Sequence, residues 1–153
     1  MEPKIVQKEA FSVVGVSKRF KMGETSDIPQ LWGQLMSQMD QIKHLVGDGN
    51  SYGVTTNYEE EENVFEYIAA FKVSEIEDVP EGMVSLEMPA QTYAVFPCTM
   101  PTIGETYDMI YQTWLPQSEY EHAYTMEFEL YPPTFDPNDP DAEFQIFIPL
   151  KTA

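Results

Sequence analysis

The sequence Met126-Glu-Phe-Glu-Leu-Tyr131 alternates between apolar and polar side chains. Alternation with a period of two predicts a β-strand. Successive side chains of a strand point to opposite faces of the sheet, so Phe128 and Leu130 share one face. The opposite face carries the remaining polar set, which is Glu127, Glu129 and Tyr131.

A helix and two further strands surround this segment. Thr102 and Glu105 stand at the spacing of a capping box. Apolar and aromatic residues then recur at helical spacing, which predicts a helix that ends at Leu115, just before Pro116. The strands of this half are predicted at 91–96, 125–131 and 143–150.

The first half of the chain has the same order of elements. A helix is predicted to begin near Ser26, and its apolar face runs from Leu31 to Val46. The acidic segment 58–63 is predicted to be a hairpin tip whose charges discourage edge pairing. The strands of this half are predicted at 11–16, 52–57 and 64–73.

Strand–helix–strand–strand therefore occurs twice, over about 1–73 and 91–153, with 74–90 as a linker. We expect a single α+β domain over residues 1–153. Its duplicated β-α-β-β units would form one antiparallel sheet, with two helices on one face and a central ligand groove on the other. If Phe128 and Leu130 pack on the helices, Glu129 faces that groove.

The charge of the chain excludes several classes of partner. Twenty-six acidic and eight basic residues give a net charge of −18. Such a charge argues against binding to nucleic acid phosphates or to anionic membranes, and favours a cationic small molecule or a basic protein. The sequence contains neither a signal peptide nor an apolar run of about 20 residues, which predicts a cytoplasmic protein without a membrane span.

Glu129 is the main candidate for chemistry. A carboxylate beside aromatic rings in a partly desolvated cleft can bind a lipophilic cation through its charge and through cation–π contacts. It can also act as a general base, because desolvation and the like charge of Glu127 both raise the pKa of Glu129. The simpler alternative is a carboxylate on a solvated sheet face.

The aromatic residues have two interpretations. Tyr107, Tyr111 and Trp114 stand at the spacing of core residues on the second helix. Trp114 lies in the last turn, where its ring can turn into a cleft. Tyr67 lies in an alternating strand and can face either side of the sheet.

Common catalytic and metal-binding motifs are absent from the sequence. His44 and His122 belong to no metal-ligand spacing, and the chain has neither a glycine-rich phosphate loop nor a GxSxG motif. We therefore expect no metal and no cofactor. Cys98 is the only cysteine, which excludes an internal disulfide, and is expected to be a small buried residue.

A series of short motifs resembles those of one known family, the GyrI-like small-molecule-binding family, which supplies the effector-binding domain of AraC-type and MerR-type multidrug regulators. The resemblance covers nearly the whole chain and implies a doubled strand–helix–strand–strand fold with a central groove. The motifs are Val13-Val-Gly-Val16, Leu31-Trp32, Tyr52-Gly-Val54, Tyr67-Ile-Ala-Ala70, Val79-Pro-Glu-Gly-Met-Val84, Thr92-Tyr-Ala-Val-Phe96, Thr113-Trp-Leu-Pro116, Phe128-Glu-Leu-Tyr131 and Ile148-Pro-Leu-Lys151.

The resemblance also implies positions for the ligand. The glutamate of the Phe-Glu-x-Tyr strand and the tryptophan of the Trp-Leu-Pro motif correspond to Glu129 and Trp114. Since no helix-turn-helix pattern precedes Phe11, we expect a stand-alone version that does not itself read DNA. The predicted ligand-binding residues are Glu129, Trp114, Tyr67, Tyr131, Glu127 and Tyr111.

Three functions are compatible with these residues. The first is the binding of small amphipathic or cationic aromatic molecules. The second is hydrolysis, because relatives that hydrolyse cyclopropane-bearing genotoxins imply catalytic roles for Glu129, Trp114 and Tyr67. The third is an acidic protein that binds a basic partner and resembles the inhibitor of DNA gyrase.

Overall fold

All the named strands of the computed structural model join one antiparallel sheet. The structure describes residues 3–21, 23–24, 26–59, 61–123, 126–136 and 138–152. The nine strands follow the order β1-β6-β9-β8-β3-β4-β2-β5, and β7 pairs with β9 beside this path. The strands are β1 (Lys4–Lys8), β2 (Phe11–Lys21), β3 (Ser51–Glu59), β4 (Val64–Val73), β5 (Val84–Met88), β6 (Gln91–Thr99), β7 (Tyr120–His122), β8 (Glu127–Tyr131) and β9 (Glu143–Thr152).

The first helix is shorter than predicted. Helix α1 spans Ile28–Ser37 and is followed by a 3-10 turn, η1, at Met39–Gln41. The apolar spacing that continues to Val46 is not helical, because the chain there lies along the edge of β4. Leu45 forms a bridge with Val73, and the Val46 amide donates to the Lys72 carbonyl at 3.0 Å.

The second helix contains a wide turn. A 3-10 turn, η2 (Met100–Thr102), leads into α2 (Ile103–Met109), which continues into a π-helical turn, η3 (Ile110–Trp114), and then into α3 (Leu115–Gln117). The predicted end at Leu115 was therefore two residues early, and Pro116 lies in the last turn of this continuous helical segment. Within the described residues, no helix is long and apolar enough to span a bilayer.

The predicted α+β class and the doubled strand–helix–strand–strand order are confirmed. Segment 74–90 is not only a connection, however, because it contains β5, which pairs with β2. Strand β1 adds a partner for β6 at the far end of the sheet. Of the strand predicted at 125–131, Thr125 lies outside the described residues.

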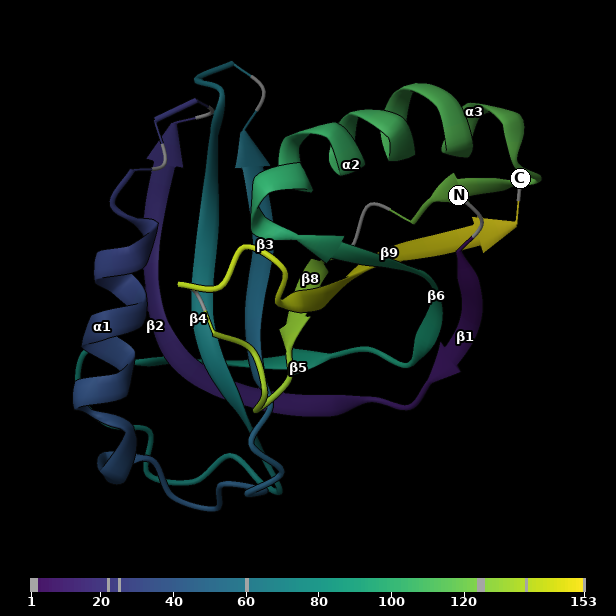
Figure 1. The fold of residues 1–153 in the computed structure, drawn as a ribbon. Coiled ribbons are helices and arrows are strands. Elements are labelled where there is room, and N and C mark those ends of the chain that lie inside the picture. The colour runs from purple at the N-terminus through teal and green to yellow at the C-terminus, as the bar shows by residue number, and fades with distance from the viewer. Residues whose placement is uncertain are drawn as a thin grey trace.

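The sheet curls, and both helical segments cover the same face (Figure 1). Helix α1 packs on β2 and β4, while α2 and η3 pack on β6 and β9. The opposite face holds a separate apolar cluster that includes Tyr52, Phe128 and Phe147. Phe128 therefore does not pack on the helices, and Glu129 and Tyr131 lie on the helix-bearing face.

The close approach of β2 and β4 predicts a strong effect of one substitution. A Cβ atom on Gly15 would lie 1.9 Å from the Ala69 carbonyl oxygen, whereas one on Gly33 in α1 would meet nothing within 4 Å. We expect Gly15→Ala to lower the free energy of unfolding by about 2–3 kcal/mol, because backbone must move. Gly33→Ala should be neutral or stabilising by up to about 1 kcal/mol. Urea unfolding followed by circular dichroism measures both, and equal stabilities would contradict the β2–β4 packing.

Candidate functional site

Glu129 lies near the middle of the helix-bearing face. Its neighbours across the sheet are Gly53 on β3 and Ile146 on β9. Gly53 in turn pairs with Ala69 on β4, so the row crosses both repeated units. Only 8% of Glu129 is exposed, which makes it one of few buried polar residues in the described part of the chain. The predicted alternative of a solvated carboxylate is therefore wrong.

Tyrosine hydroxyls surround the carboxylate. Tyr131 donates to Oε1 of Glu129 at 2.6 Å, and Tyr107 donates to Oε2 at 2.8 Å. Tyr67 is a third hydrogen-bonding neighbour. These residues come from β8, α2 and β4, so each carboxylate oxygen is satisfied from a different element.

Trp32 connects α1 to the same group. Its Nε1 donates to the Tyr67 hydroxyl at 3.1 Å. Its ring also meets the Tyr131 ring edge to face, with 5.5 Å between centroids. We call Glu129, Tyr67, Tyr107, Tyr131 and Trp32 the Glu129 cluster.

Gly53 provides the space for Tyr67. A Cβ atom at Gly53 would lie 2.2 Å from the Tyr67 hydroxyl oxygen and 3.3 Å from Oε1 of Glu129. Glycine therefore lets the hydroxyl group lie directly over the backbone of β3. This close contact explains why the Tyr-Gly-Val motif has a glycine at position 53.

A second carboxylate lies beside the cluster. Glu127 accepts a hydrogen bond from Tyr111, and His122 Nε2 lies 3.4 Å from Glu127 Oε2. The Tyr111 ring stacks with that of Tyr107 at 6.4 Å and with that of His122 at 6.0 Å. We call Glu127, Tyr111 and His122 the outer group, since Tyr111 is 39% exposed.

Burial dominates the electrostatics of Glu129. Desolvation raises the pKa of Glu129, and the nearby charge of Glu127 acts in the same direction. The hydrogen bonds from the tyrosines oppose this rise without cancelling it. The expected direction of the pKa shift is therefore confirmed, although the carboxylate is hydrogen-bonded and not bare.

The tyrosines remain proton donors. Desolvation, followed by the charge of Glu129, raises the pKa of Tyr67 and of Tyr107 well above the usual value. Their hydroxyls are therefore proton donors to the carboxylate at neutral pH. None of the ion pairs found among the described residues involves Glu129, so its charge is stabilised by dipoles alone.

The structure brings most of the predicted site residues together. Tyr67 and Tyr131 contact Glu129 directly, and Glu127 and Tyr111 lie in the adjacent outer group. Trp114 instead packs edge to face on Phe96, with 5.3 Å between centroids. Phe96 and Glu129 flank Ile146 from two different strands, which places them about 10 Å apart.

Three members of these groups were missed from the sequence. Tyr107 fits the spacing of a core residue, which hid the role of its hydroxyl. Trp32 stands in the Leu31-Trp32 motif, but nothing local links that motif to Glu129. His122 reaches Glu127 through the short strand β7, for which the sequence has no clear period.

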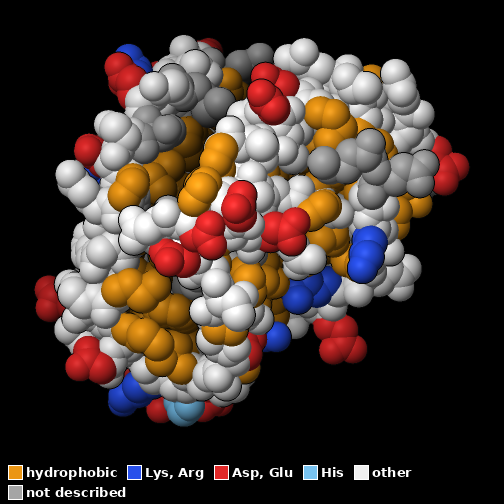
Figure 2. All heavy atoms as spheres, in the orientation of Figure 1, with side chains coloured by type: hydrophobic (Ala, Val, Ile, Leu, Met, Phe, Trp, Pro, Cys, Tyr) orange, Lys and Arg blue, Asp and Glu red, His pale blue; other side chains and the backbone are white. Residues whose placement is uncertain are grey.

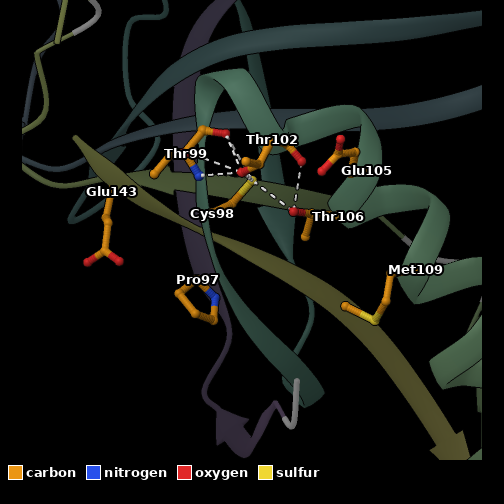
Figure 3. Close-up of a pocket in the computed structure, with 8 residues that line it drawn as sticks. All are labelled: Pro97, Cys98, Thr99, Thr102, Glu105, Thr106, Met109 and Glu143. Carbon is orange, nitrogen blue, oxygen red and sulfur yellow. Dashed lines mark hydrogen bonds between the residues drawn. The ribbon is translucent and has the colours of Figure 1, made fainter. Parts of the chain in front are cut away.

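A surface pocket of about 400 Å³ lies elsewhere, where β6 meets α2 (Figure 3). Cys98 is buried beside it and donates to Thr106 Oγ1 at 3.5 Å. Glu105 and Met109 line it from α2, and Glu143 lines it from the start of β9. The pocket shares no lining residue with the Glu129 cluster.

A possible metal-ligand set lies at the end of β4. His44 Nε2 is 3.1 Å from Glu75 and 3.7 Å from Glu77, and all three residues are exposed. The sequence showed no metal-ligand spacing because the fold, and not a local motif, brings these residues together. Their exposure is typical of a surface ion-pair cluster.

Acidic side chains dominate the charged surface. Figure 2 shows them gathered near the middle of the face drawn, between areas of apolar side chains. The segment between β8 and β9 alone contributes Asp136, Asp139 and Asp141, all exposed. The net charge of −18 therefore produces a negative field around the molecule.

Comparison with known proteins agrees with the resemblance seen in the motifs. The family model described as "Cass2: Integron-associated effector binding protein" matches residues 4–150. The transcriptional regulator BrlR of Pseudomonas aeruginosa is 36% identical over 153 residues. The match covers 98% of this chain and 56% of BrlR, so the chain spans little more than half of that relative.

Solved structures share the fold. The structure of SAV2435 bound to tetraphenylphosphonium superposes with a TM-score of 0.78 and 16% identity, over 99% of this chain and 94% of that one. The integron cassette protein VCH_CASS2 of Vibrio cholerae superposes with a TM-score of 0.61 and 19% identity, over 98% and 96%. The expected fold is thereby confirmed independently of the motifs.

The raised pKa of Glu129 predicts a pH dependence of stability. Because the folded state holds this proton more tightly than the unfolded chain, its contribution is full below the ordinary glutamate pKa and is lost as pH rises through the raised pKa. The wild type should therefore lose stability relative to Glu129→Gln over that window, by roughly 1.4 kcal/mol per unit of pKa difference.

Chemical unfolding between about pH 4 and pH 8 measures this difference in stability, because the interval begins near the ordinary glutamate pKa and extends above it. Glu87→Gln, which removes an exposed carboxylate on β5, is the matched control and should follow the wild type. If the difference in the free energy of unfolding between wild type and Glu129→Gln stays constant with pH, burial does not raise the pKa of Glu129.

Proposed function

The chain belongs to the family of integron-associated effector-binding proteins, and we propose that it binds lipophilic cations at Glu129, between α1 and α2. The observation that carries this proposal is a carboxylate that is 8% exposed and forms no ion pair with any described residue. A buried charge of this kind is costly unless a counter-charge joins it. A cationic ligand would supply that counter-charge.

The aromatic rings of the cluster would provide the remaining affinity. Trp32, Tyr107 and Tyr131 surround the carboxylate, and their π faces attract cations that carry apolar groups. The hydroxyls would stabilise the ionised form of Glu129 while the ligand neutralises it. The negative field of the whole chain would raise the local concentration of cations.

Ligand entry requires side-chain movement. The rings cover Glu129 in the described conformation, so a ligand of drug size must displace at least part of the cover. Tyr107 and Trp32 are the residues placed to move, because both reach the cluster from helices and not from the sheet. Binding would then exchange ring–ring contacts for ring–ligand contacts.

The drug-bound relative supports the class of ligand. SAV2435 shares this fold and was solved with tetraphenylphosphonium, a lipophilic cation. A buried acid between aromatic rings can attract such a cation through its charge and through cation–π contacts. The structure of this chain and the ligand of that relative thus point to the same class of small molecule.

A second candidate function is hydrolysis in the same place. The raised pKa of Glu129 favours a general base that could activate water against a reactive electrophile. Incubation with cyclopropane-containing electrophiles, followed by mass spectrometry, tests this candidate. Turnover no greater than that of Glu129→Gln would leave binding as the function.

Tetraphenylphosphonium is the probe for the binding proposal. We expect the wild type to bind it and to ignore the neutral triphenylphosphine oxide, since the charge supplies the selectivity. Glu129→Gln should weaken binding at least about tenfold, or 1.4 kcal/mol, by isothermal titration calorimetry. Glu105→Gln, an exposed change on α2 with the same loss of charge, should bind as the wild type does. Equal affinity in Glu129→Gln, or no binding by the wild type, would overturn the proposal.

Substitution of each tryptophan tests whether the ligand binds at the Glu129 cluster, which contains Trp32, or near Trp114, the position implied by the family resemblance. Because Trp32 contacts Tyr67 and Tyr131, Trp32→Phe should weaken tetraphenylphosphonium binding several-fold. Trp114→Phe should leave the affinity nearly unchanged, and the remaining Trp32 fluorescence should change on titration. The opposite ranking would place the ligand over Phe96 and Trp114.

A further inference from the structure

Two carboxylates on β8 form a repeated arrangement. Glu127 and Glu129 alternate with Phe128 and therefore share one face, about 7 Å apart along the strand. Each accepts a hydrogen bond from its own tyrosine, Glu129 from Tyr107 at 2.8 Å and Glu127 from Tyr111.

The tyrosines repeat the spacing of the carboxylates. The rings of Tyr107 and Tyr111 are nearly parallel, with an interplanar angle of 8° and 6.4 Å between centroids. Two parallel tyrosine–carboxylate pairs thus stand side by side, with matching separations on the strand and on the helix. A π-helical turn begins at Ile110, between the two tyrosines.

The two pairs differ in their access to solvent. Glu129 is buried in the cluster, whereas the Glu127 side chain is 18% exposed and its partner Tyr111 is 39% exposed. His122 holds the outer carboxylate from β7 at 3.4 Å. Glu129 is therefore the buried carboxylate of the site, and Glu127 is the more solvent-accessible one.

Resting on the proposed function, we propose that the site selects dications whose two positive centres are about 7 Å apart, with the inner centre on Glu129 and the outer one on Glu127. Glu127 is then the residue that determines the preference for two charges over one. The repulsion between the two carboxylates supports this assignment, because it is relieved most when both acquire a cation. An aromatic spacer between the centres would lie against the Tyr107 and Tyr111 rings.

Three rigid probes test the spacing. The first is para-xylylene-bis(trimethylammonium), whose nitrogen atoms are separated by a single ring and its methylene groups. The second is its biphenyl homologue, in which the charges are farther apart. The third is the monocation para-methylbenzyl-trimethylammonium. Calorimetric titrations are made at one fixed pH for all three probes.

We expect the wild type to bind the xylylene dication at least about tenfold more tightly than the monocation, and more tightly than the biphenyl homologue. Glu127→Gln should abolish the preference: the affinity for the dication should fall at least about tenfold, and that for the monocation only by the smaller loss expected when one nearby negative charge is removed. Glu127→Asp, which keeps the charge, should retain most of the preference. Glu105→Gln removes the same charge from an exposed position and controls for the general negative field.

The outcomes separate this inference from the proposed function. If the wild type binds the monocation through Glu129 but shows no preference for the xylylene dication, the function stands and the two-centre site is wrong. Equal weakening of both probes by Glu127→Gln would also overturn it, because Glu127 would then act only through the general field. If neither probe nor tetraphenylphosphonium binds, the proposed function itself fails.

Discussion

The hydrogen bonding of the buried Glu129 carboxylate constrains the placement of both helices. A carboxylate removed from water must have its oxygens satisfied, and the hydroxyls that do so come from different parts of the chain. Tyr67 belongs to the first repeated unit, while Tyr107 and Tyr131 belong to the second. The cluster therefore fixes the two units relative to each other at the point where β3 and β8 pair.

Apolar packing on the other face of the sheet supports this junction. Phe128 stacks on Phe147 at 4.5 Å and meets the Tyr52 ring edge to face at 5.7 Å. Aromatic contacts of this kind add to the backbone pairing that holds β8 between β3 and β9. The two faces of β8 therefore have different roles. The face with Phe128 packs in the apolar cluster, and the helix-bearing face carries Glu127 and Glu129.

The sequence predicted the order of elements well because strands and helices here have clear periods. It also predicted that Glu127 and Glu129 share a face, since alternation requires it. Alternation is symmetric, however, and cannot indicate which face the helices cover, so the acids were placed on the wrong side. Tyr107 was read as a core residue because it stands at helical spacing with Ile110 and Trp114, and spacing does not show that its hydroxyl contacts Glu129. Strand β5 was missed because five residues between Pro- and Glu-rich stretches resemble a connection.

The π-helical turn at Ile110–Trp114 depends on the exact number of residues in this part of the helix. A π turn contains more residues than an α turn, so removing a single residue would restore ordinary helical geometry. The helix on the two sides of the turn would keep nearly the same phase, but residues within the turn would be displaced relative to those that precede it. Tyr107 precedes the turn and Tyr111 lies within it, and their parallel rings depend on the present placement. During divergence of related chains, substitutions in this turn should therefore be tolerated more readily than insertions or deletions.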